Sequence, residues 1–234
     1  MDQFPVAVRL ALTATALAAC LLTGPLTDAD QKPQTRRLFN GRNFDGWYTF
    51  IEGDGKNNDP DHIFTIEPGG VIHVLGKKMG YLGTDRDYAN YRLSLEFRWG
   101  EKKWSPREND PRDAGVLYHC VGPDKVWMKS VECQIEEGDV GDVWLTGGEG
   151  GEPSLTVKGK KYTGGRVVKF ADFEKPKGQW NEVTVVADGD RIRHYVNGHL
   201  NMEGSESSLT RGKINLQSEG AEIYYRNVTL TPLR

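Results

Sequence analysis

The chain has 234 residues and a net charge of −3, from 30 Lys and Arg against 33 Asp and Glu. This balance excludes the basic surface by which proteins bind nucleic acid. The 28 glycines and 11 prolines can punctuate many short strands but are too few to indicate a disordered chain. About 200 residues after removal of a leader suit one all-β domain.

The N-terminal segment has the pattern of an export signal. After the single basic residue Arg9, residues 10–19 form an apolar run too short to span a bilayer. Leu17-Ala18-Ala19-Cys20 resembles a bacterial lipobox, whose cysteine would be lipidated, whereas cleavage after Ala29 would give a soluble secreted form. Both alternatives stay open. We predict a signal peptide over 1–29, a linker over 30–36 and a folded domain over 37–234, located in the periplasm or lipid-anchored to the bacterial cell envelope. Membrane contact is expected only through such an anchor.

The folded part follows the two-residue period of β-strands, and no segment after residue 30 gives a convincing amphipathic helix. The clearest strand covers residues 91–99, where every second side chain is apolar and the others are charged or polar. The apolar row is Tyr91, Leu93, Leu95, Phe97 and Trp99. The other predicted strands, in chain order, are 63–66, 71–75, 116–121, 131–136, 181–187, 191–196, 199–202, 213–217 and 222–230.

Local signals between these strands predict turns, a bulge and a long loop. Asn197-Gly198 is typical of a type I′ hairpin turn, because both central residues need positive φ. A change in apolar parity predicts a bulge near Asn227. His194 alternates with apolar neighbours, so we expect it to be buried or to face a second sheet. The glycine-rich stretch 138–165 is expected to be a long loop. Together these features predict an all-β sandwich or jelly roll with two antiparallel sheets.

The segment 131–136 carries the sharpest chemical signal. Alternation places Glu132, Gln134 and Glu136 on one face and apolar side chains on the other. Carboxylates can act as general acid and base, and an amide can bind sugar hydroxyls. The alternative is an ordinary solvated strand face, and both readings stay open.

His119 is connected to this row through the strand register. If Cys120 lies opposite Cys133, His119 lies opposite Gln134 and on the face of Glu132, whereas a one-residue slip moves it to the other face. A disulfide between the two cysteines and a cluster of His119 with Glu132 are therefore linked predictions. Two buried free thiols are the alternative.

The acidic stretch 136–142 offers oxygen ligands but lacks the spacing of an EF-hand loop. Asp139 and Asp142 are weak candidates for a divalent cation, and a solvated turn is the preferred interpretation. We expect no required cofactor, although a divalent cation is possible.

Four groups of segments occur in a recognisable order: Leu38-Phe39-Asn40-Gly41-Arg42-Asn43-Phe44-Asp45-Gly46-Trp47; Ala114-Gly115-Val116 with Glu132-Cys133-Gln134-Ile135; Gly178-Gln179-Trp180-Asn181-Glu182-Val183 with Val196-Asn197-Gly198; and Gly212-Lys213-Ile214-Asn215-Leu216-Gln217 with Tyr225-Arg226-Asn227-Val228. Together they resemble the 3-keto-disaccharide hydrolase domain family over about residues 37–233. The resemblance implies a concanavalin A-like jelly roll, an exported bacterial protein and carbohydrate as substrate. Cys133, where the family usually has an aliphatic residue, and Asp113-Ala114, where Asn-Ser is common, depart from the family pattern.

Some members of this family cleave glycosides whose sugar is oxidised at C3, which implies removal of the C2 proton and loss of the C1 substituent. For that chemistry we expect Glu132 or His119 as base, Glu136 as acid, and Gln134 and Arg98 as stabilisers of the enolate. The candidates for stacking on the sugar are Trp47, Tyr81 and Trp144, each of which could instead pack in the core. A carbohydrate-binding module without turnover and a conventional glycosidase are the alternative functions.

Overall fold

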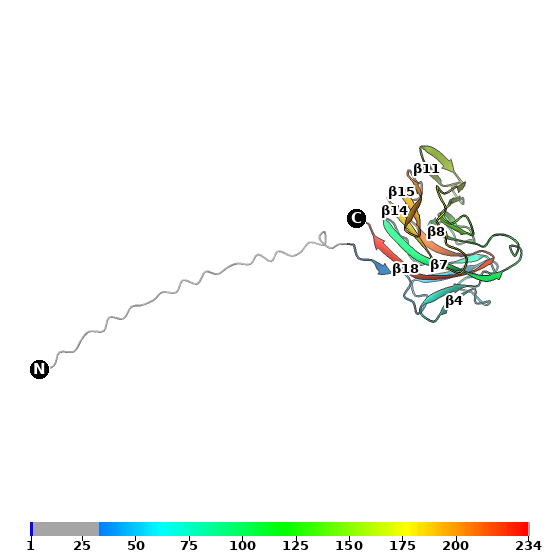
Figure 1. Ribbon diagram of the computed structural model, residues 1–234, viewed down its shortest axis with the longest axis horizontal. Helices are drawn as coiled ribbons and strands as arrows, with labels where there is room; N and C mark the ends of the chain where they lie inside the picture. Colours follow the sequence, from blue (N-terminus) through cyan, green and yellow to red (C-terminus); the bar gives the residue numbers. More distant parts are fainter. Residues whose placement is uncertain (2–32, 234) are drawn as a thin grey trace. The chain divides into compact units, whose positions relative to one another are not determined.

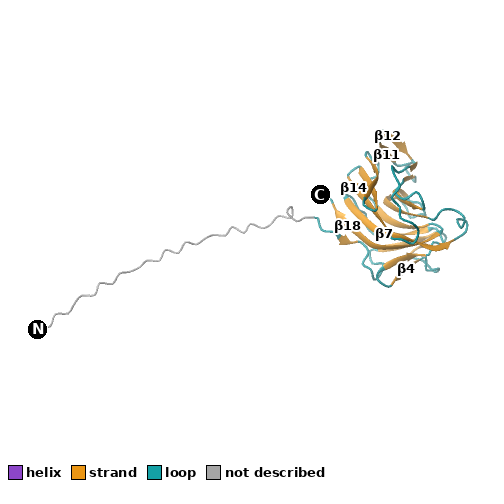
Figure 2. Ribbon diagram, in the orientation of Figure 1, coloured by secondary structure: helices purple, strands orange, loops and turns teal. Residues whose placement is uncertain are grey.

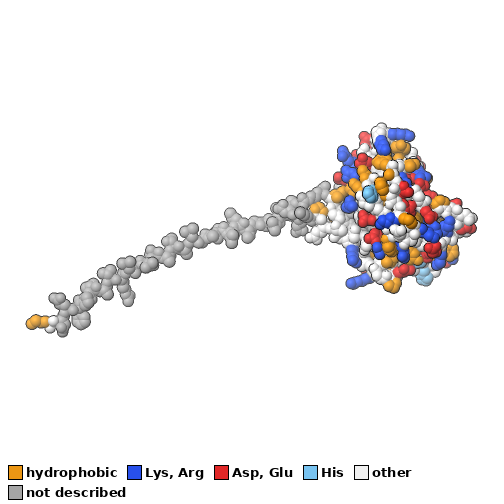
Figure 3. Space-filling view, viewed as in Figure 1, with side chains coloured by type: hydrophobic (Ala, Val, Ile, Leu, Met, Phe, Trp, Pro, Cys, Tyr) orange, Lys and Arg blue, Asp and Glu red, His pale blue; other side chains and the backbone are white. Residues whose placement is uncertain are grey.

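The computed structural model describes residue 1 and residues 33–233. The predicted signal peptide with its lipobox, apart from Met1, lies outside the described residues. The described part of the chain consists of strands and loops (Figure 2). It includes no helix long and apolar enough to cross a membrane. Acidic and basic side chains are interspersed over the face drawn in Figure 3, in keeping with the small net charge.

Residues 33–233 fold as a sandwich of two eight-stranded antiparallel sheets with a separate two-stranded ribbon (Figure 1). Sheet A has the order β16 (His199–Gly204), β15 (Arg191–Val196), β14 (Asn181–Asp188), β7 (Tyr91–Lys103), β18 (Ala221–Pro232), β5 (Val71–Val74), β4 (Phe64–Glu67), with β1 (Arg36–Arg37) also on β18. Sheet B has the order β13 (Gly165–Val167), β10 (Val143–Thr146), β9 (Lys129–Glu136), β8 (Asp113–Val121), β17 (Lys213–Ser218), β6 (Gly80–Thr84), β2 (Trp47–Ile51), β3 (Gly55–Lys56). The ribbon is β11 (Ser154–Val157) with β12 (Lys160–Thr163).

Alternating apolar rows from both sheets form the core. The row predicted on β7 is confirmed, since its five side chains are at most 3% exposed. From sheet B, Val131, Cys133 and Ile135 enter the same cluster. Fully burying one large apolar side chain contributes about 1.5–3 kcal/mol, so a one-residue slip of either strand would cost several such contributions. The burial pattern therefore fixes which face of β9 points away from the core.

The predicted turn, bulge and buried histidine are confirmed. Asn197 and Gly198 have φ of 50° and 82°, and the β18–β7 register shifts between Arg226 and Thr229. His194 is fully buried, donates from Nδ1 to Gly141 O (3.1 Å) and accepts at Nε2 from the Tyr118 hydroxyl (2.9 Å). Burial lowers the pKa of His194 to about 4, so this histidine is neutral in the folded protein.

The prediction of a long loop over 138–165 was wrong. This stretch contains β10, β11 and β12. Each of these strands has only four residues, too few to give a clear period. The β11–β12 hairpin turns at Lys158-Gly159, with φ of 48° and 76°. Lysine at positive φ is uncommon, so the turn carried no recognisable signal.

The predicted register between the two cysteine-bearing strands was also wrong. Cys133 lies opposite Val116, and a bulge interrupts the β8–β9 ladder between Tyr118 and Val121. His119 occupies this bulge with φ of 53°. The extra residue reverses the parity of the strand. Cys120 consequently packs in a cluster with Tyr48, Tyr81, Leu117 and Met128, apart from the core cluster that holds Cys133. Both cysteines are buried free thiols, so the disulfide is excluded and its alternative is confirmed.

Candidate active site

Sheet B carries a pocket of ≈ 310 Å³ on its face away from the core. The three polar residues of β9 predicted to share a face, Glu132, Gln134 and Glu136, all line it. The parity expected from the sequence is thus confirmed, and the face is a concave pocket rather than an ordinary solvated surface. The full lining is Arg107, Asp113, Trp127, Glu132, Gln134, Glu136, Trp144, Thr146 and Glu219.

Gly115 creates the space in which the Glu132 carboxyl lies. It sits on β8 next to β9, opposite Gln134. A Cβ at Gly115 would lie 1.9 Å from Glu132 Oε1 and 2.7 Å from Gln217 Oε1. A side chain cannot be accommodated there without moving both groups. The glycine therefore lets Glu132 lie across β8 towards β17.

Three carboxyls of the pocket are almost completely buried: Asp113 and Glu132 are 5% exposed and Glu219 is 7% exposed. Arg107 forms ion pairs with Asp113 and with Glu219 (3.1 Å). One guanidinium therefore faces several carboxyls. Because a single positive charge cannot compensate all of them, this arrangement disfavours ionisation of every carboxyl at once.

The pKa values of these acids are raised accordingly. Burial raises the pKa of Asp113 to about 6 despite its ion pair with Arg107. Burial and the charge of Asp113 raise the pKa of Glu219 to about 7. Burial, followed by the charges of Glu219 and Asp113, raises the pKa of Glu132 well above its ordinary value. The pocket therefore retains protons near neutral pH, as a site for proton transfer requires.

Gln134 connects the acids at the pocket wall. Its Nε2 donates to Asp113 Oδ1 (3.1 Å) and to Glu136 Oε2 (3.2 Å). Both amide hydrogens are used within the pocket, so Gln134 orients two carboxyls.

Two indole rings border the acids. Trp144, predicted as a stacking residue, lines the pocket, and within residues 33–233 its buried Nε1 has no hydrogen-bond partner. Trp127 is 42% exposed and was not predicted. Aromatic rings beside carboxyls and an amide are a combination that binds the apolar and hydroxyl-bearing faces of a sugar.

Four predicted site residues do not line the pocket. Trp47 is only 6% exposed, lies in the core and donates from Nε1 to Leu38 O (3.1 Å). Arg98 belongs to sheet A, where it lies 5.1 Å from the ring centres of Trp180 and Tyr224. Because the odd-numbered residues of β7 fill the core, Arg98 points away from sheet B.

The other two predicted site residues are Tyr81 and His119. Burial keeps Tyr81 out of the pocket, and the bulge in β8 keeps His119 out of it. Tyr81 is fully buried, and its hydroxyl donates to Asp124 (2.8 Å). His119 donates from Nδ1 to Leu209 O (3.0 Å) and packs edge-on against Tyr91 and Tyr118. Burial lowers the pKa of His119 to about 4. The predicted cluster of His119 with Glu132 was wrong because the bulge turns His119 to the core side.

The acids considered for a cation face Arg166. Asp139 lies 2.7 Å from the Arg166 guanidinium. Asp142, fully buried, accepts from Arg166 and from the backbone N–H of Lys169 (2.8 Å). In residues 33–233 no group of three or more His, Cys, Asp or Glu side chains is arranged to hold a metal ion. The guanidinium therefore provides the positive charge that these two acids face.

The sequence analysis did not assign a site role to Arg107, Asp113, Trp127 or Glu219, which line the pocket. For Glu219 a signal was present: Asn215, Gln217 and Glu219 alternate at the end of β17, as the acids and amide do on β9. Arg107 and Trp127 lie in loops, where no periodicity constrains direction.

The loop that carries Trp127 is held to the sheet through Asp124. Its carboxylate accepts from the hydroxyls of Tyr48 (2.5 Å) and Tyr81 (2.8 Å) and from Lys56 Nζ (3.1 Å). These hydrogen bonds outweigh burial and hold the pKa of Asp124 below its ordinary value. Asp124 thereby fixes one wall of the pocket.

Replacing Asp124 with alanine should leave the two tyrosine hydroxyls without their acceptor. We expect the free energy of unfolding in urea to fall by about 1–3 kcal/mol, and Trp127 fluorescence to become more accessible to acrylamide quenching. Asp61→Ala is the matched control, because Asp61 pairs with Lys77 and Lys78 at the surface and should change little. Equal effects in both variants would show that Asp124 does not anchor the loop of Trp127.

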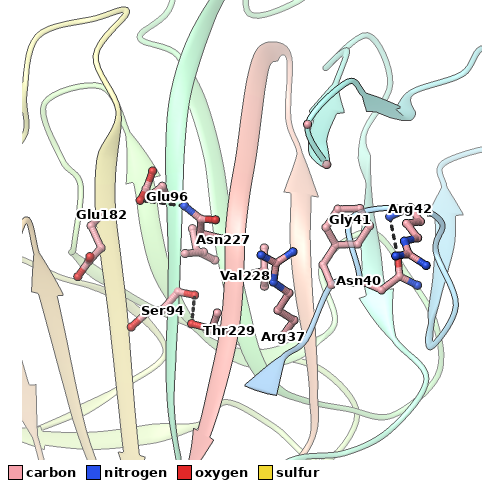
Figure 4. Close-up of a pocket in the computed structure, with 14 residues that line it drawn as sticks. Arg37, Asn40, Gly41, Arg42, Ser94, Glu96, Glu182, Asn227, Val228 and Thr229 are labelled. Carbon is pink, nitrogen blue, oxygen red and sulfur yellow. Dashed lines mark hydrogen bonds between the residues drawn. The ribbon is translucent and has the colours of Figure 1, made fainter. Parts of the chain in front are cut away.

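A second, larger pocket of ≈ 470 Å³ lies on sheet A, around β7 and β18 (Figure 4). Its lining has two acids, Glu96 and Glu182. Glu96 forms an ion pair with Arg226 and accepts from Asn227 (3.1 Å). Phe39, the one aromatic residue in its lining, is 4% exposed and belongs to the core. Without a free ring face or a buried acid cluster, this pocket is the weaker candidate for sugar chemistry.

Comparisons with known proteins agree with this fold. The model of the 3-keto-alpha-glucoside-1,2-lyase-like domain family matches residues 34–231. A crystal structure of a proposed glycosyl hydrolase from Parabacteroides distasonis is 23% identical, with a TM-score of 0.60 over 86% of this chain and 94% of that chain. The β-glucanase of Bacillus licheniformis is 12% identical, with a TM-score of 0.56 over 88% and 100%. No curated protein matches the sequence. The sandwich is therefore a concanavalin A-like jelly roll, as expected.

Proposed function

We propose that this chain, which belongs to the 3-keto-alpha-glucoside-1,2-lyase-like domain family, cleaves glycosides oxidised at C3 in the carboxyl pocket of sheet B. The family makes carbohydrate the expected ligand. The observation that carries the proposal is the convergence of Glu132, Asp113, Glu219 and Arg107 beside two indoles in one pocket. Its volume of ≈ 310 Å³ is at the lower end for ligand sites and suits a single sugar ring.

The proposed reaction begins at C2, which the neighbouring ketone acidifies. A base takes the C2 proton, and the electron pair of that bond forms an enolate with its negative charge on the C3 oxygen. The enolate re-forms the ketone as a C1–C2 double bond forms and the C1–oxygen bond breaks, and the leaving oxygen takes a proton from an acid. Water then adds its hydroxyl to C1 and a proton to C2, so the net reaction is hydrolysis. Ordinary glycosidases instead pass through an oxocarbenium-like transition state.

The side chains of the pocket can be assigned to these steps. Glu132 is the base in its ionised form, because burial makes its carboxylate a strong proton acceptor. Arg107, rather than Arg98, stabilises the enolate, since it is the cation that lines the pocket. Glu219, rather than Glu136, is the acid, because a pKa of about 7 leaves it a proton at neutral pH. Glu136 then orients Gln134. No cofactor enters this scheme.

The direct test is incubation with 3-keto-glucosides and with the same glucosides unoxidised. We expect release of the leaving group from the keto substrates alone, measured by chromatography. Cleavage of the unoxidised glycosides would indicate a conventional glycosidase. Saturable binding of sugar without turnover of either substrate would indicate a carbohydrate-binding module.

We also propose export, on the pattern of residues 1–29, with a soluble periplasmic form or a form lipid-anchored at Cys20. Fractionation of cells that express the full chain would test it, and retention in the cytoplasm would contradict it.

A further inference from the structure

The carboxyl pocket of sheet B, from here on called the acid pocket, adjoins a second hollow of ≈ 440 Å³, here called the apolar groove. The two share Trp127 and Thr146 in their linings, so a ligand larger than the pocket can extend past these residues into the second hollow. The groove is lined by Phe50, Glu52, Gly53, Lys125, Val126, Trp127, Thr146 and Gly147.

The two hollows differ in chemistry. The pocket brings together four carboxyls, an amide and a guanidinium. The groove instead presents the side chains of Phe50, Val126 and Trp127, with two glycines that add no side chain. Its charged residues are Glu52 and Lys125, both exposed, and Lys125 donates from Nζ to Gly147 O at 3.5 Å. A polar sugar ring suits the first surface and a flat apolar ring suits the second.

The aromatic residues of the groove are held in place. The Phe50 ring stacks on Tyr81, with ring centres 5.5 Å apart and planes 18° apart. Tyr81 in turn donates to Asp124, which precedes Trp127 in the same loop and so anchors that loop to the sheet. Trp127 is nevertheless 42% exposed. An exposed indole on an anchored loop next to a polar pocket marks a binding surface rather than core.

We propose that the apolar groove binds the leaving group of the glycoside and that it fits a planar aromatic aglycone, such as a phenol. This inference rests on the proposed function, which places the sugar ring in the acid pocket. The scissile C1–oxygen bond then lies at the border marked by Trp127 and Thr146. A second sugar as leaving group would need a row of hydrogen-bonding side chains on one strand, as on β9, whereas Glu52, Lys125 and Thr146 of the groove come from three separate segments.

The test compares two 3-keto-glucosides, one of 4-methylumbelliferone and one of methanol, with wild type, Phe50→Ala and Trp127→Ala. Phe50 lines the groove but not the pocket, so Phe50→Ala should lower kcat/KM about tenfold for the aryl substrate and leave the methyl substrate unchanged. Trp127 lines both hollows, so Trp127→Ala should lower kcat/KM for both substrates. Each variant is compared with wild type on the same substrate, because 4-methylumbelliferone and methanol differ in their intrinsic ability as leaving groups. Trp180→Ala is the control and should change neither rate, because Trp180 directly precedes β14 and its ring lies beside Arg98 and Arg226 of sheet A.

An aryl-to-methyl ratio of kcat/KM that is unchanged in Phe50→Ala would overturn the inference while leaving the proposed function intact. If wild type cleaves neither substrate, the proposed function fails and calorimetric titration with 4-methylumbelliferone decides about the groove. Binding that weakens about tenfold in Trp127→Ala, or in Phe50→Ala if that variant folds, would support the inference. No binding by wild type would overturn it.

Discussion

Replacing Glu132 with glutamine should lower kcat/KM for a 3-keto-glycoside by about 10³-fold, within the range that a positioned acid–base group contributes. The amide keeps the shape of the side chain but cannot take the C2 proton. In wild type the ionised form of Glu132 carries the reaction. Because burial and the charges of Glu219 and Asp113 raise its pKa, kcat/KM should increase from acid pH through neutrality instead of reaching a plateau near the ordinary pKa of a glutamate.

The same substitution should stabilise the folded protein at alkaline pH. A carboxyl whose pKa is higher in the folded than in the unfolded state stabilises the fold below its unfolded pKa, and that contribution is lost as pH rises through the folded pKa. Glu132→Gln removes this loss. Glutamine can also donate towards Gln217 Oε1, which has no partner within residues 33–233. Urea denaturation should therefore show a larger gain for the variant at pH 8 than at pH 5.

Glu137→Gln is the matched control. Glu137 directly follows the row of Glu132, Gln134 and Glu136, here called the acid row, but it pairs with Arg112 (3.1 Å) instead of lining the pocket. It should leave kcat/KM and the pH dependence of stability nearly unchanged. If Glu132→Gln kept more than a tenth of wild-type activity, Glu132 would not be the base. A stability gain equal at both pH values would show that burial does not raise the pKa of Glu132.

Replacing Gly115 with alanine should lower kcat/KM about 10²-fold with the fold intact. The new Cβ would lie 1.9 Å from Glu132 Oε1 and 2.7 Å from Gln217 Oε1, so both side-chain ends must move. A displacement of about 1 Å at a reacting group can cost about 10²-fold in rate. The relevant measurement is kcat/KM together with circular dichroism, because the expected loss is positional and should leave the strand signal unchanged.

Gly100→Ala is the matched control for this prediction. Its Cβ would lie 2.4 Å from Glu222 Oε2, a similar overlap with a carboxylate on sheet A, and neither residue lines the pocket. We expect reduced stability with normal kcat/KM. Equal loss of activity in both variants would mean that Gly115→Ala acts through general destabilisation, and normal activity in Gly115→Ala would contradict the placement of Glu132.

Sequence alternation alone identified the sandwich and the central acid row. Strands β7 and β9 were recognisable because a two-residue period leaves only one way to bury an apolar row. The direction of Glu132 and Gln134 follows from that row, since the neighbours that fill the core force them to the other face. The hairpin at Asn197-Gly198 and the bulge near Asn227 were equally local, because positive φ and a parity change are properties of a few adjacent residues.

Only the tertiary structure decided what surrounds the acid row. The bulge at His119 reverses the parity of one strand end and moves His119 into the core, and nothing in its sequence marks it. Arg107 and Trp127 come from loops whose direction depends on distant contacts, such as the hydrogen bonds that hold Asp124. The raised pKa values of Asp113 and Glu219 likewise require burial and mutual proximity. Alternation along one strand is determined by backbone geometry within the chain segment, whereas the charge, cover and depth of a pocket depend on segments that only folding brings together.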